Sequence, residues 1–249
     1  MARLETKHLD LGDISIAYRE YGTGPDLLLL HGNSGSKSMY ASYQREQFRD
    51  FHTWAVDSRC HGQSRSTDTS LTIGQIADDI VRFCRKQGIR RAFVIGYSDG
   101  GNIALFLASR APELFPRIVA VSPNYLVSGT TEEGLRLFRA MRKTAVTLGR
   151  LGFNTSKQIM RCDLMLRDIG IAEEELRGIR TRMQILHAEK DLIKEDHIRR
   201  LAELIPGACL AKIRNCTHLS IHGKTEAVKT MREFLLQDLP TVSPPPVCP

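Results

Sequence analysis

Short apolar runs alternate with helix-length amphipathic segments along most of this chain, and this alternation restricts the possible folds more than any other feature. The apolar runs have the length of buried strands. They occupy residues 14–18, 27–30, 53–56, 92–95, 118–121, 183–186 and 208–213. Helical patterns lie between most of them, at residues 73–87, 102–109, 195–204 and 225–236. The sequence therefore predicts an α/β fold with a mostly parallel sheet covered by helices on both faces.

One interval, residues 123–181, breaks this alternation. It contains no strand-like run, and its helical patterns fall at residues 132–148, 155–166 and 172–179. We therefore predict a helical cap inserted into an α/β core made of residues 1–122 and 182–238. The remaining residues, 239–249, are rich in proline and are predicted to form a flexible tail.

Composition argues against several classes of protein. With 249 residues, of which 42% are hydrophobic and 25% charged, the chain is expected to bury a globular core. No apolar run approaches the roughly 20 residues that cross a bilayer, and the N-terminus lacks the apolar segment of a secretory signal. The net charge of +7 comes from basic residues spread along the chain, without the clusters that bind nucleic acid. We expect a cytoplasmic protein with neither a nucleic-acid nor a membrane partner.

The cysteines give no sign of a disulfide framework or a metal site. They lie at positions 60, 84, 162, 209, 216 and 248, and no two of them form a C-x-x-C pair. Without a secretory signal they are expected to remain reduced thiols. Since no ligand spacing supports a metal site, the sequence predicts neither a metal nor another cofactor.

A glycine-flanked serine follows the strand predicted at residues 92–95. Residues 96–101 read G-Y-S-D-G-G and precede a predicted helix. A serine on such a sharp turn has a strained backbone, so the residues two positions away must be small. The turn would hold the Ser98 hydroxyl above the sheet edge at a helix N-terminus, where a developing anion is stabilised. This pattern predicts a nucleophile; the alternative is a glycine turn with an incidental serine.

A nucleophilic serine needs a base, and the base needs an acid that orients it. In sheets of this kind the order along the chain is serine, acid, histidine. Asp191 and His218 each follow a strand-like run, as Ser98 does. We therefore predict Asp191 as the acid and His218 as the base. Of the competitors, Asp196 falls inside the next helix, near its N-terminus, and His222 lies four residues past His218, where the two could share a helical face.

When a serine attacks a carbonyl group, two backbone N–H groups are also needed to bind the carbonyl oxygen as it becomes negatively charged. One is expected from Asp99, directly after the nucleophile. The other is expected from Asn33, in the loop that follows the strand at residues 27–30, where Gly32 allows close approach of the backbone. His31 in the same loop is expected to tie the loop down by hydrogen bonds; by residue type, the alternative is a catalytic role.

These residues resemble the α/β-hydrolase superfamily. The similar motifs run in order within residues 8–238. They are H-G-N at 31–33, D-S-R-C-H-G-Q-S at 57–64, the serine turn at 96–101, E-K-D at 189–191 and T-H at 217–218. By matching positions, the resemblance implies that Ser98 is the nucleophile, Asp191 the acid and His218 the base. It also implies that the amides of Asn33 and Asp99 bind the oxyanion.

The resemblance further implies that residues 123–181 form the cap that shapes the acyl pocket. Two positions depart from the family pattern: Cys60 stands where a turn usually has glycine, and Ala188 stands where the strand before the acid often ends in glycine. Both lie away from the predicted reacting groups, so we interpret them as local adjustments. Serine at position 98 disfavours the epoxide-hydrolase and haloalkane-dehalogenase branches, which use an aspartate nucleophile there.

The sequence thus predicts a serine hydrolase that cleaves a carboxylic ester or thioester of a small to medium, largely apolar acyl group. Candidate pocket residues are His31 and Tyr97 from the core, and Tyr125, Leu126, Phe138, Met141, Leu151 and Phe153 from the cap, although at least half of the cap residues are expected only to pack. One alternative is other chemistry on the same three residues: carbon–carbon bond hydrolysis, perhydrolysis or a lyase reaction. Another is a non-catalytic ligand receptor, which the complete set of three disfavours.

Three basic residues of the predicted cap, Arg136, Arg139 and Lys143, lie on one helix face. They predict either a solvated helix surface or a site for an acyl group delivered on an anionic carrier, such as coenzyme A or acyl carrier protein.

Overall fold

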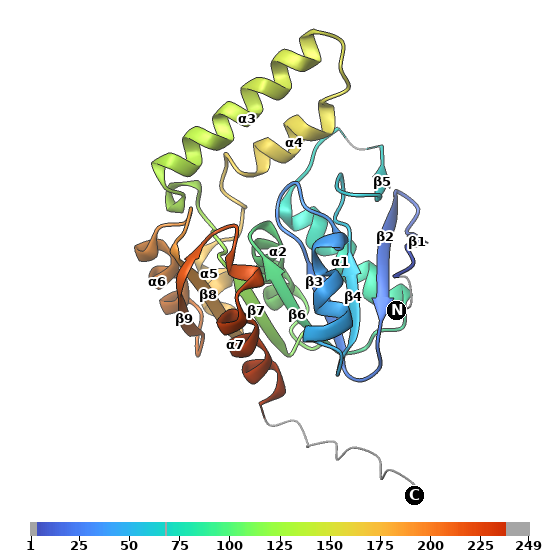
Figure 1. Ribbon diagram of the computed structural model, residues 1–249, viewed down its shortest axis with the longest axis vertical. Coiled ribbons are helices and arrows are strands. Elements are labelled where there is room, and N and C mark those ends of the chain that lie inside the picture. Colours follow the sequence, from blue (N-terminus) through green and yellow to red (C-terminus); the bar gives the residue numbers. More distant parts are fainter. Residues whose placement is uncertain (1–3, 68, 238–249) are drawn as a thin grey trace, which may run out of the picture.

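The computed structural model describes residues 4–67 and 69–237, which form one sheet with helices on both faces (Figure 1). The nine strands of this part of the chain are β1 Lys7–Asp10, β2 Ile14–Tyr21, β3 Asp26–Leu30, β4 His52–Val56, β5 Arg65–Ser66, β6 Ala92–Tyr97, β7 Arg117–Val121, β8 Arg182–Lys190 and β9 Cys209–Thr217. Their order is β1-β2-β4-β3-β6-β7-β8-β9, and β5 pairs with β2. The pairs from β4 to β9 are parallel, whereas β2 is antiparallel to its neighbours. The predicted mostly parallel sheet is confirmed.

The helices also follow the predicted pattern closely. They are α1 Ile73–Lys86, α2 Asp99–Arg110, α3 Glu132–Arg150, α4 Ser156–Leu164, α5 Glu173–Gly178, α6 Glu195–Leu204 and α7 Thr225–Leu236. Four single-turn elements join them: η1 Lys37–Tyr40, η2 Tyr43–Gln47, η3 Val127–Gly129 and η4 Ile221–Gly223. Thr72 begins α1 as its N-cap, because its hydroxyl accepts a hydrogen bond from the Gln75 amide at 3.0 Å.

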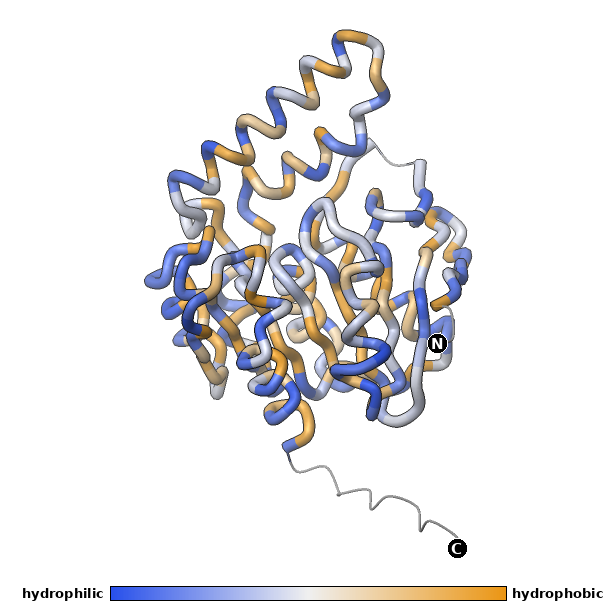
Figure 2. The backbone as a smooth tube through the Cα atoms, in the orientation of Figure 1, coloured by the Kyte–Doolittle hydropathy of each residue, from blue (hydrophilic) through white to orange (hydrophobic). Residues whose placement is uncertain are grey.

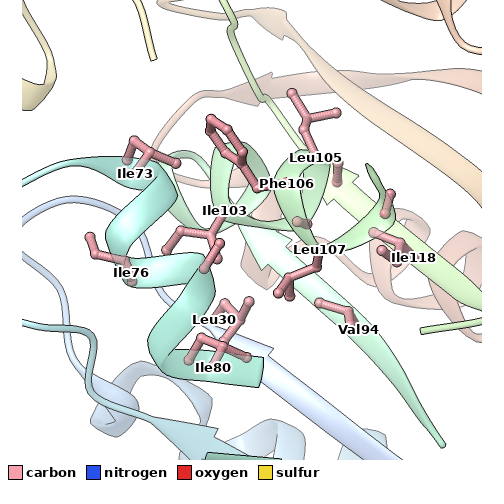
Figure 3. Close-up of a cluster of buried hydrophobic side chains, with 14 of the residues drawn as sticks. Leu30, Ile73, Ile76, Ile80, Val94, Ile103, Leu105, Phe106, Leu107 and Ile118 are labelled. Atoms are coloured by element: carbon pink, nitrogen blue, oxygen red, sulfur yellow. The ribbon is translucent and has the colours of Figure 1, made fainter. Parts of the chain in front are cut away.

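Two apolar layers form because successive strand residues point to opposite faces of the sheet. In β3, Leu28 and Leu30 belong to the larger cluster, which α1 and α2 cover, as Figure 3 shows for Leu30 and its neighbours. Leu27 and Leu29 belong to the other cluster, which α7 and the segment around Tyr43 cover. Figure 2 shows the hydrophobic segments gathered along the central strands. Helices on both faces thereby bury the sheet, as predicted.

Two strands, β1 and β5, are absent from the sequence prediction. β1 reads K-H-L-D and lies at the sheet edge with exposed or half-exposed side chains, so it has no apolar signal. β5 has only two residues. Neither position carries a pattern that would separate it from a loop. The predicted tail, residues 239–249, and Cys248 lie outside the described residues.

Residues 123–181 contain η3, α3, α4 and α5 and, within the described structure, no strand of the sheet. α3 and α4 pack against each other and project beyond the sheet (Figure 1). α5, in contrast, contacts α2 and α6, and its Leu176 belongs to the larger apolar cluster. The division into a core and a cap stays a prediction; α5, at least, packs as part of the main body.

Within residues 4–67 and 69–237, no helix is both long and apolar enough to cross a membrane.

Because His197 on α6 is buried, we expect the free energy of unfolding to fall in acid. Its ring stacks on Tyr125 with centroids 4.7 Å apart, and burial lowers its pKa to about 4. An unfolded chain protonates histidine near pH 6.5, so between these values the unfolded state binds more protons. The contribution of neutral His197 to the free energy of unfolding is therefore complete above pH 6.5 and is lost as the pH falls towards 4.

We expect the variant His197→Gln to have a shallower dependence of unfolding free energy on pH in this window, by up to about 1.4 kcal/mol per pH unit. Urea unfolding at several pH values between 4.5 and 7.5 measures the two slopes. The other buried histidines titrate equally in both proteins, so the difference isolates His197. Equal slopes in the native protein and His197→Gln would contradict a lowered pKa of His197 in the folded state.

Candidate active site

The ends of the parallel strands meet at one edge of the sheet and bring distant residues together. Ser98 follows β6, Ser122 follows β7, Asp191 follows β8 and His218 follows β9. The loop after β3 contains Asn33. Five consecutive strands of the sheet therefore contribute to one location.

Ser98 lies on a strained turn between β6 and α2. Its backbone angles are φ 53° and ψ −118°, a region that side chains rarely adopt. The Ser98 amide donates to the Val121 carbonyl oxygen at 2.8 Å, which fixes the turn against β7. A Cβ atom at Gly96 would overlap the Gly100 carbonyl oxygen, and one at Gly100 would overlap the Leu30 carbonyl oxygen. Both flanking positions therefore require glycine.

Hydrogen bonds join Ser98, His218 and Asp191 in series. His218 Nδ1 lies 2.6 Å from Asp191 Oδ1, and His218 Nε2 lies 3.1 Å from Ser98 Oγ. Because a carboxylate only accepts, Nδ1 carries the proton and Nε2 accepts from the serine hydroxyl. The hydroxyl of Tyr97 donates to the His218 carbonyl oxygen at 2.8 Å, so the base is held from a second side. The three residues predicted from strand ends are thus in mutual contact.

Asp191 is buried but remains ionised at neutral pH. Burial alone would raise its pKa, yet hydrogen bonds from His218 and Ser122, with the charge of His218, hold the pKa below its usual value. The Ser122 hydroxyl donates to Asp191 Oδ2 at 2.6 Å, and the amides of Ala188 and Ile193 donate to the same carboxylate. Ser122 is not among the predicted site residues, because a serine at this strand end offers no carboxylate for the role of the acid. The signal that could have indicated Ser122 is its position directly after β7, which pairs with β8 in the sheet.

In a reaction that uses Ser98 as the nucleophile, replacing Ser122 by alanine is expected to lower kcat/KM about tenfold, because Asp191 loses one charged hydrogen bond and orients His218 less firmly. Ser122 has φ 51°, so the matched variant Ser122→Gly removes the same hydroxyl while relieving the backbone. Steady-state kinetics on both variants should give the same loss, although their stabilities differ. Full activity in either variant would show that the hydroxyl has no role.

Asn33 and Asp99, the predicted oxyanion residues, lie side by side. The Asn33 side chain donates to Asp99 Oδ2 at 2.8 Å, and a Cβ atom at Gly32 would come within 3.0 Å of the Ser98 Cβ. Helix N-termini leave their first N–H groups without intrahelical acceptors, and Asp99 is the first residue of α2. Among the described residues, the main-chain N–H of neither Asn33 nor Asp99 has an acceptor. Both amides are free for a ligand; their oxyanion role stays a prediction.

The Asp99 carboxyl is buried, and this burial raises its pKa despite the hydrogen bonds from Asn33 and Asn102.

Buried polar contacts hold the loop that carries Asn33. The His31 Nε2 accepts from the Ser58 amide at 3.0 Å, so Nδ1 carries the proton and donates to the Gly32 carbonyl oxygen at 2.8 Å. Burial lowers the pKa of His31, which favours this neutral form. Both ring nitrogens are occupied, as expected for a residue that ties its loop down. At the loop's other end, Lys37 pairs with the buried Asp57 at 2.6 Å.

The remaining predicted pocket residues lie in different surroundings. Tyr125 is buried, and its hydroxyl donates to Glu173 at 3.0 Å, so its contacts are with α5 and α6. Phe138 and Met141 are half-buried on α3. Leu151 and Phe153 are 69% and 63% exposed at the turn after α3, and so do not line an enclosed pocket. A pocket role for Tyr97, Tyr125, Phe138 and Met141 stays a prediction.

The competing acid and base lie elsewhere. Asp196 lies in the first turn of α6, where its carboxylate accepts from the His197 amide at 2.8 Å. His222 lies in η4 with its ring 5.4 Å from that of Tyr97. In the described structure, no group of three histidine, cysteine or acidic side chains could hold a metal ion.

Comparisons with known proteins bear on the fold of this chain. Residues 25–144 match a family model described as the alpha/beta hydrolase fold. The chain is 30% identical over 116 residues to a 2-(acetamidomethylene)succinate hydrolase of Mesorhizobium japonicum, an alignment that covers 47% of this chain and 42% of that relative. The match thus spans less than half of the relative's length.

Two solved structures match over nearly the whole chain. A hydrolase from Pseudomonas aeruginosa superposes with a TM-score of 0.76 at 21% identity, over 92% of this chain and 98% of that one. The enol-lactonase of Burkholderia xenovorans superposes with a TM-score of 0.75 at 22% identity, over 93% of this chain and all (100%) of that one. These likenesses and the strand order define an α/β-hydrolase fold. The chain therefore has the α/β-hydrolase fold, and residues 25–144 are similar to the family of that name.

Proposed function

We propose that this chain is a serine hydrolase that cleaves a carboxylic ester or thioester of a small to medium, largely apolar acyl group. One observation carries the proposal: the hydrogen-bonded series of Ser98, His218 and Asp191, with Ser98 on a strained turn. A residue that serves only structure has no physical need for such strain, which persists in proteins mainly where function requires it. The similarity to an enol-lactonase and to a succinate-derivative hydrolase is compatible with hydrolysis.

In the proposed reaction, the Ser98 hydroxyl loses its proton to His218 Nε2 as Oγ attacks the carbonyl carbon. The carbonyl oxygen becomes an oxyanion that the amides of Asn33 and Asp99 would stabilise. His218 then protonates the leaving alcohol or thiol, which departs and leaves an acyl group on Ser98. Water, deprotonated by His218, releases the acid and restores the serine. Asp191 keeps the imidazole oriented and stabilises its cation throughout.

The proposal is tested with p-nitrophenyl esters from acetate to decanoate, together with the matching thioesters. We expect saturable hydrolysis with a preferred chain length, and an acyl adduct on the peptide that contains Ser98 after rapid acid quenching. A folded protein that turns over none of these substrates and shows no adduct would overturn the proposal.

A narrower form of the proposal concerns delivery of the acyl group by an anionic carrier. Arg136, Arg139 and Lys143 are exposed on α3, and the last two line a groove with Arg142, Val146, Thr147 and Arg150. If a carrier binds here, neutralising the three predicted residues should lower kcat/KM for an acyl-coenzyme A about tenfold and leave p-nitrophenyl esters unaffected. Equal effects on both substrates would assign these residues to a solvated surface.

A further inference from the structure

A cationic side chain of α4 reaches the loops beside Ser98. The Arg161 carbonyl oxygen accepts from the Asn33 side chain at 2.8 Å, so this turn of α4 lies on the predicted oxyanion loop. The Arg161 guanidinium extends to the turn after β4, where Nη1 donates to the Cys60 carbonyl oxygen at 3.4 Å. Cys60 itself has φ 62°, which explains why related turns use glycine there. Arg161 therefore contacts two loops at the sheet edge where Ser98 lies.

The charge of Arg161 has no counterion within the described chain. The guanidinium Nε is buried without a hydrogen-bond partner, and the only hydrogen bond that the guanidinium makes to the described residues is the long one to Cys60. The nearby Asp57 is already paired with Lys37, and burial raises the pKa of Asp99. Arg142 on α3, in contrast, pairs with Asp163 at 2.6 Å. A half-buried, unpaired guanidinium is costly unless a ligand uses it.

Two further buried polar atoms in the same turn have no partner among the described residues: Ser58 Oγ and His61 Nε2. His61 Nδ1 lies 2.8 Å from the Arg59 carbonyl oxygen and so carries the proton, which leaves Nε2 as an acceptor. Burial, followed by the neighbouring His31 ring, lowers the pKa of His61 to about 3, and the charge of Arg161 acts in the same direction. His31 and His61 lie with ring centroids 5.1 Å apart. Ser58 and His61 thus lie in the turn after β4 whose Cys60 carbonyl oxygen accepts from Arg161.

We propose that Arg161 binds a carboxylate carried by the substrate of this enzyme, with the Ser58 hydroxyl as a further donor. The inference rests on the proposed function and adds one anionic group to the otherwise apolar acyl substrate. A guanidinium offers two parallel N–H groups that match a carboxylate, and a hydroxyl adds a third donor. Since Gly32 of the adjoining loop abuts Ser98, a substrate bound at Arg161 can extend its ester towards the nucleophile.

The test compares two substrates of equal length, p-nitrophenyl hydrogen glutarate, which is anionic, and p-nitrophenyl pentanoate, which is neutral. We expect the native protein to favour the anionic ester in kcat/KM, and Arg161→Gln to lower that preference about tenfold to a hundredfold. Pentanoate hydrolysis should fall less than glutarate ester hydrolysis, and thermal unfolding of the variant checks that it folds. Arg161→Lys keeps the charge without the paired N–H groups and should fall between the two.

Lys157 provides the matched control, since it is exposed one turn earlier on α4. Lys157→Gln removes the same charge and should leave the preference unchanged. A binding measurement is independent of turnover: glutarate should slow fluorophosphonate labelling of Ser98 in the native protein and not in Arg161→Gln.

Three outcomes would count against the inference. If Arg161→Gln retains the preference while both esters are hydrolysed, the unpaired atoms bind only water, and the inference fails while the proposed function stands. If Lys157→Gln loses as much preference as Arg161→Gln, the effect is a general one of charge. If no ester is hydrolysed and Ser98 is not labelled, the proposed function fails and the inference falls with it.

Discussion

Replacing Ser98 by alanine is expected to lower kcat for ester hydrolysis by about 10⁴–10⁶-fold. The proposed reaction forms a covalent bond to Oγ, and no neighbouring group can replace that atom: His218 Nε2 faces it at 3.1 Å, and the adjoining amides only donate. Alanine retains the Cβ and therefore the strained backbone at φ 53°. The melting temperature should consequently change by only a few degrees. Steady-state kinetics and thermal unfolding of the same preparation measure both effects.

Ser38 supplies the matched control, because it is exposed on η1. Ser38→Ala removes a hydroxyl from the same protein and should keep native activity. A Ser98→Ala protein that retains more than about one hundredth of the native kcat would contradict a covalent mechanism.

The second large effect concerns stability. Lys37→Met is expected to lower the free energy of unfolding by about 3–5 kcal/mol, because it leaves the Asp57 carboxylate buried without its cation. Lys37 and Asp57 have side chains that are 2% and 0% exposed, with Nζ and Oδ2 2.6 Å apart. Asp57 also accepts from the Lys37 and Gln63 amides, at 2.6 and 2.8 Å, so the pair anchors the end of the loop that carries Asn33. Urea unfolding at pH 7 measures the change.

A surface ion pair serves as the comparison. Lys7 and Glu20 pair on the outside of the sheet, with side chains 46% and 29% exposed. Lys7→Met should cost less than about 1 kcal/mol, since water screens an exposed pair. Similar losses in the two variants would mean that burial does not govern the Lys37–Asp57 pair.

Elements with a clear apolar period could be predicted from sequence. α6 and α7 begin and end at the expected residues, because apolar residues at helical spacing mark the face that packs on the sheet. β1 could not be found, since its exposed K-H-L-D sequence gains its structure only by pairing with β2. Packing of α5 on α2 and α6 also depends on tertiary contacts that its short sequence does not encode.

The hydrogen-bonded series at the site could be anticipated because its members share one rule: each follows a strand whose end lies at the same sheet edge. Ser122 obeys that rule too, as a polar group that supports the acid rather than replaces it. Arg161 could not be found in this way. Its contact with Asn33 joins residues 128 positions apart through the placement of α4, for which the sequence holds no local signal.

The claim that Ser98 is an activated nucleophile is tested most directly by the intact mass of the protein after exposure to a fluorophosphonate. The chemistry needs the base and the oriented acid, but no knowledge of the natural substrate. We predict one added phosphonyl group on the native protein and none on Ser98→Ala. A folded native protein without an adduct, or an equal adduct on both proteins, would contradict the assignment of Ser98.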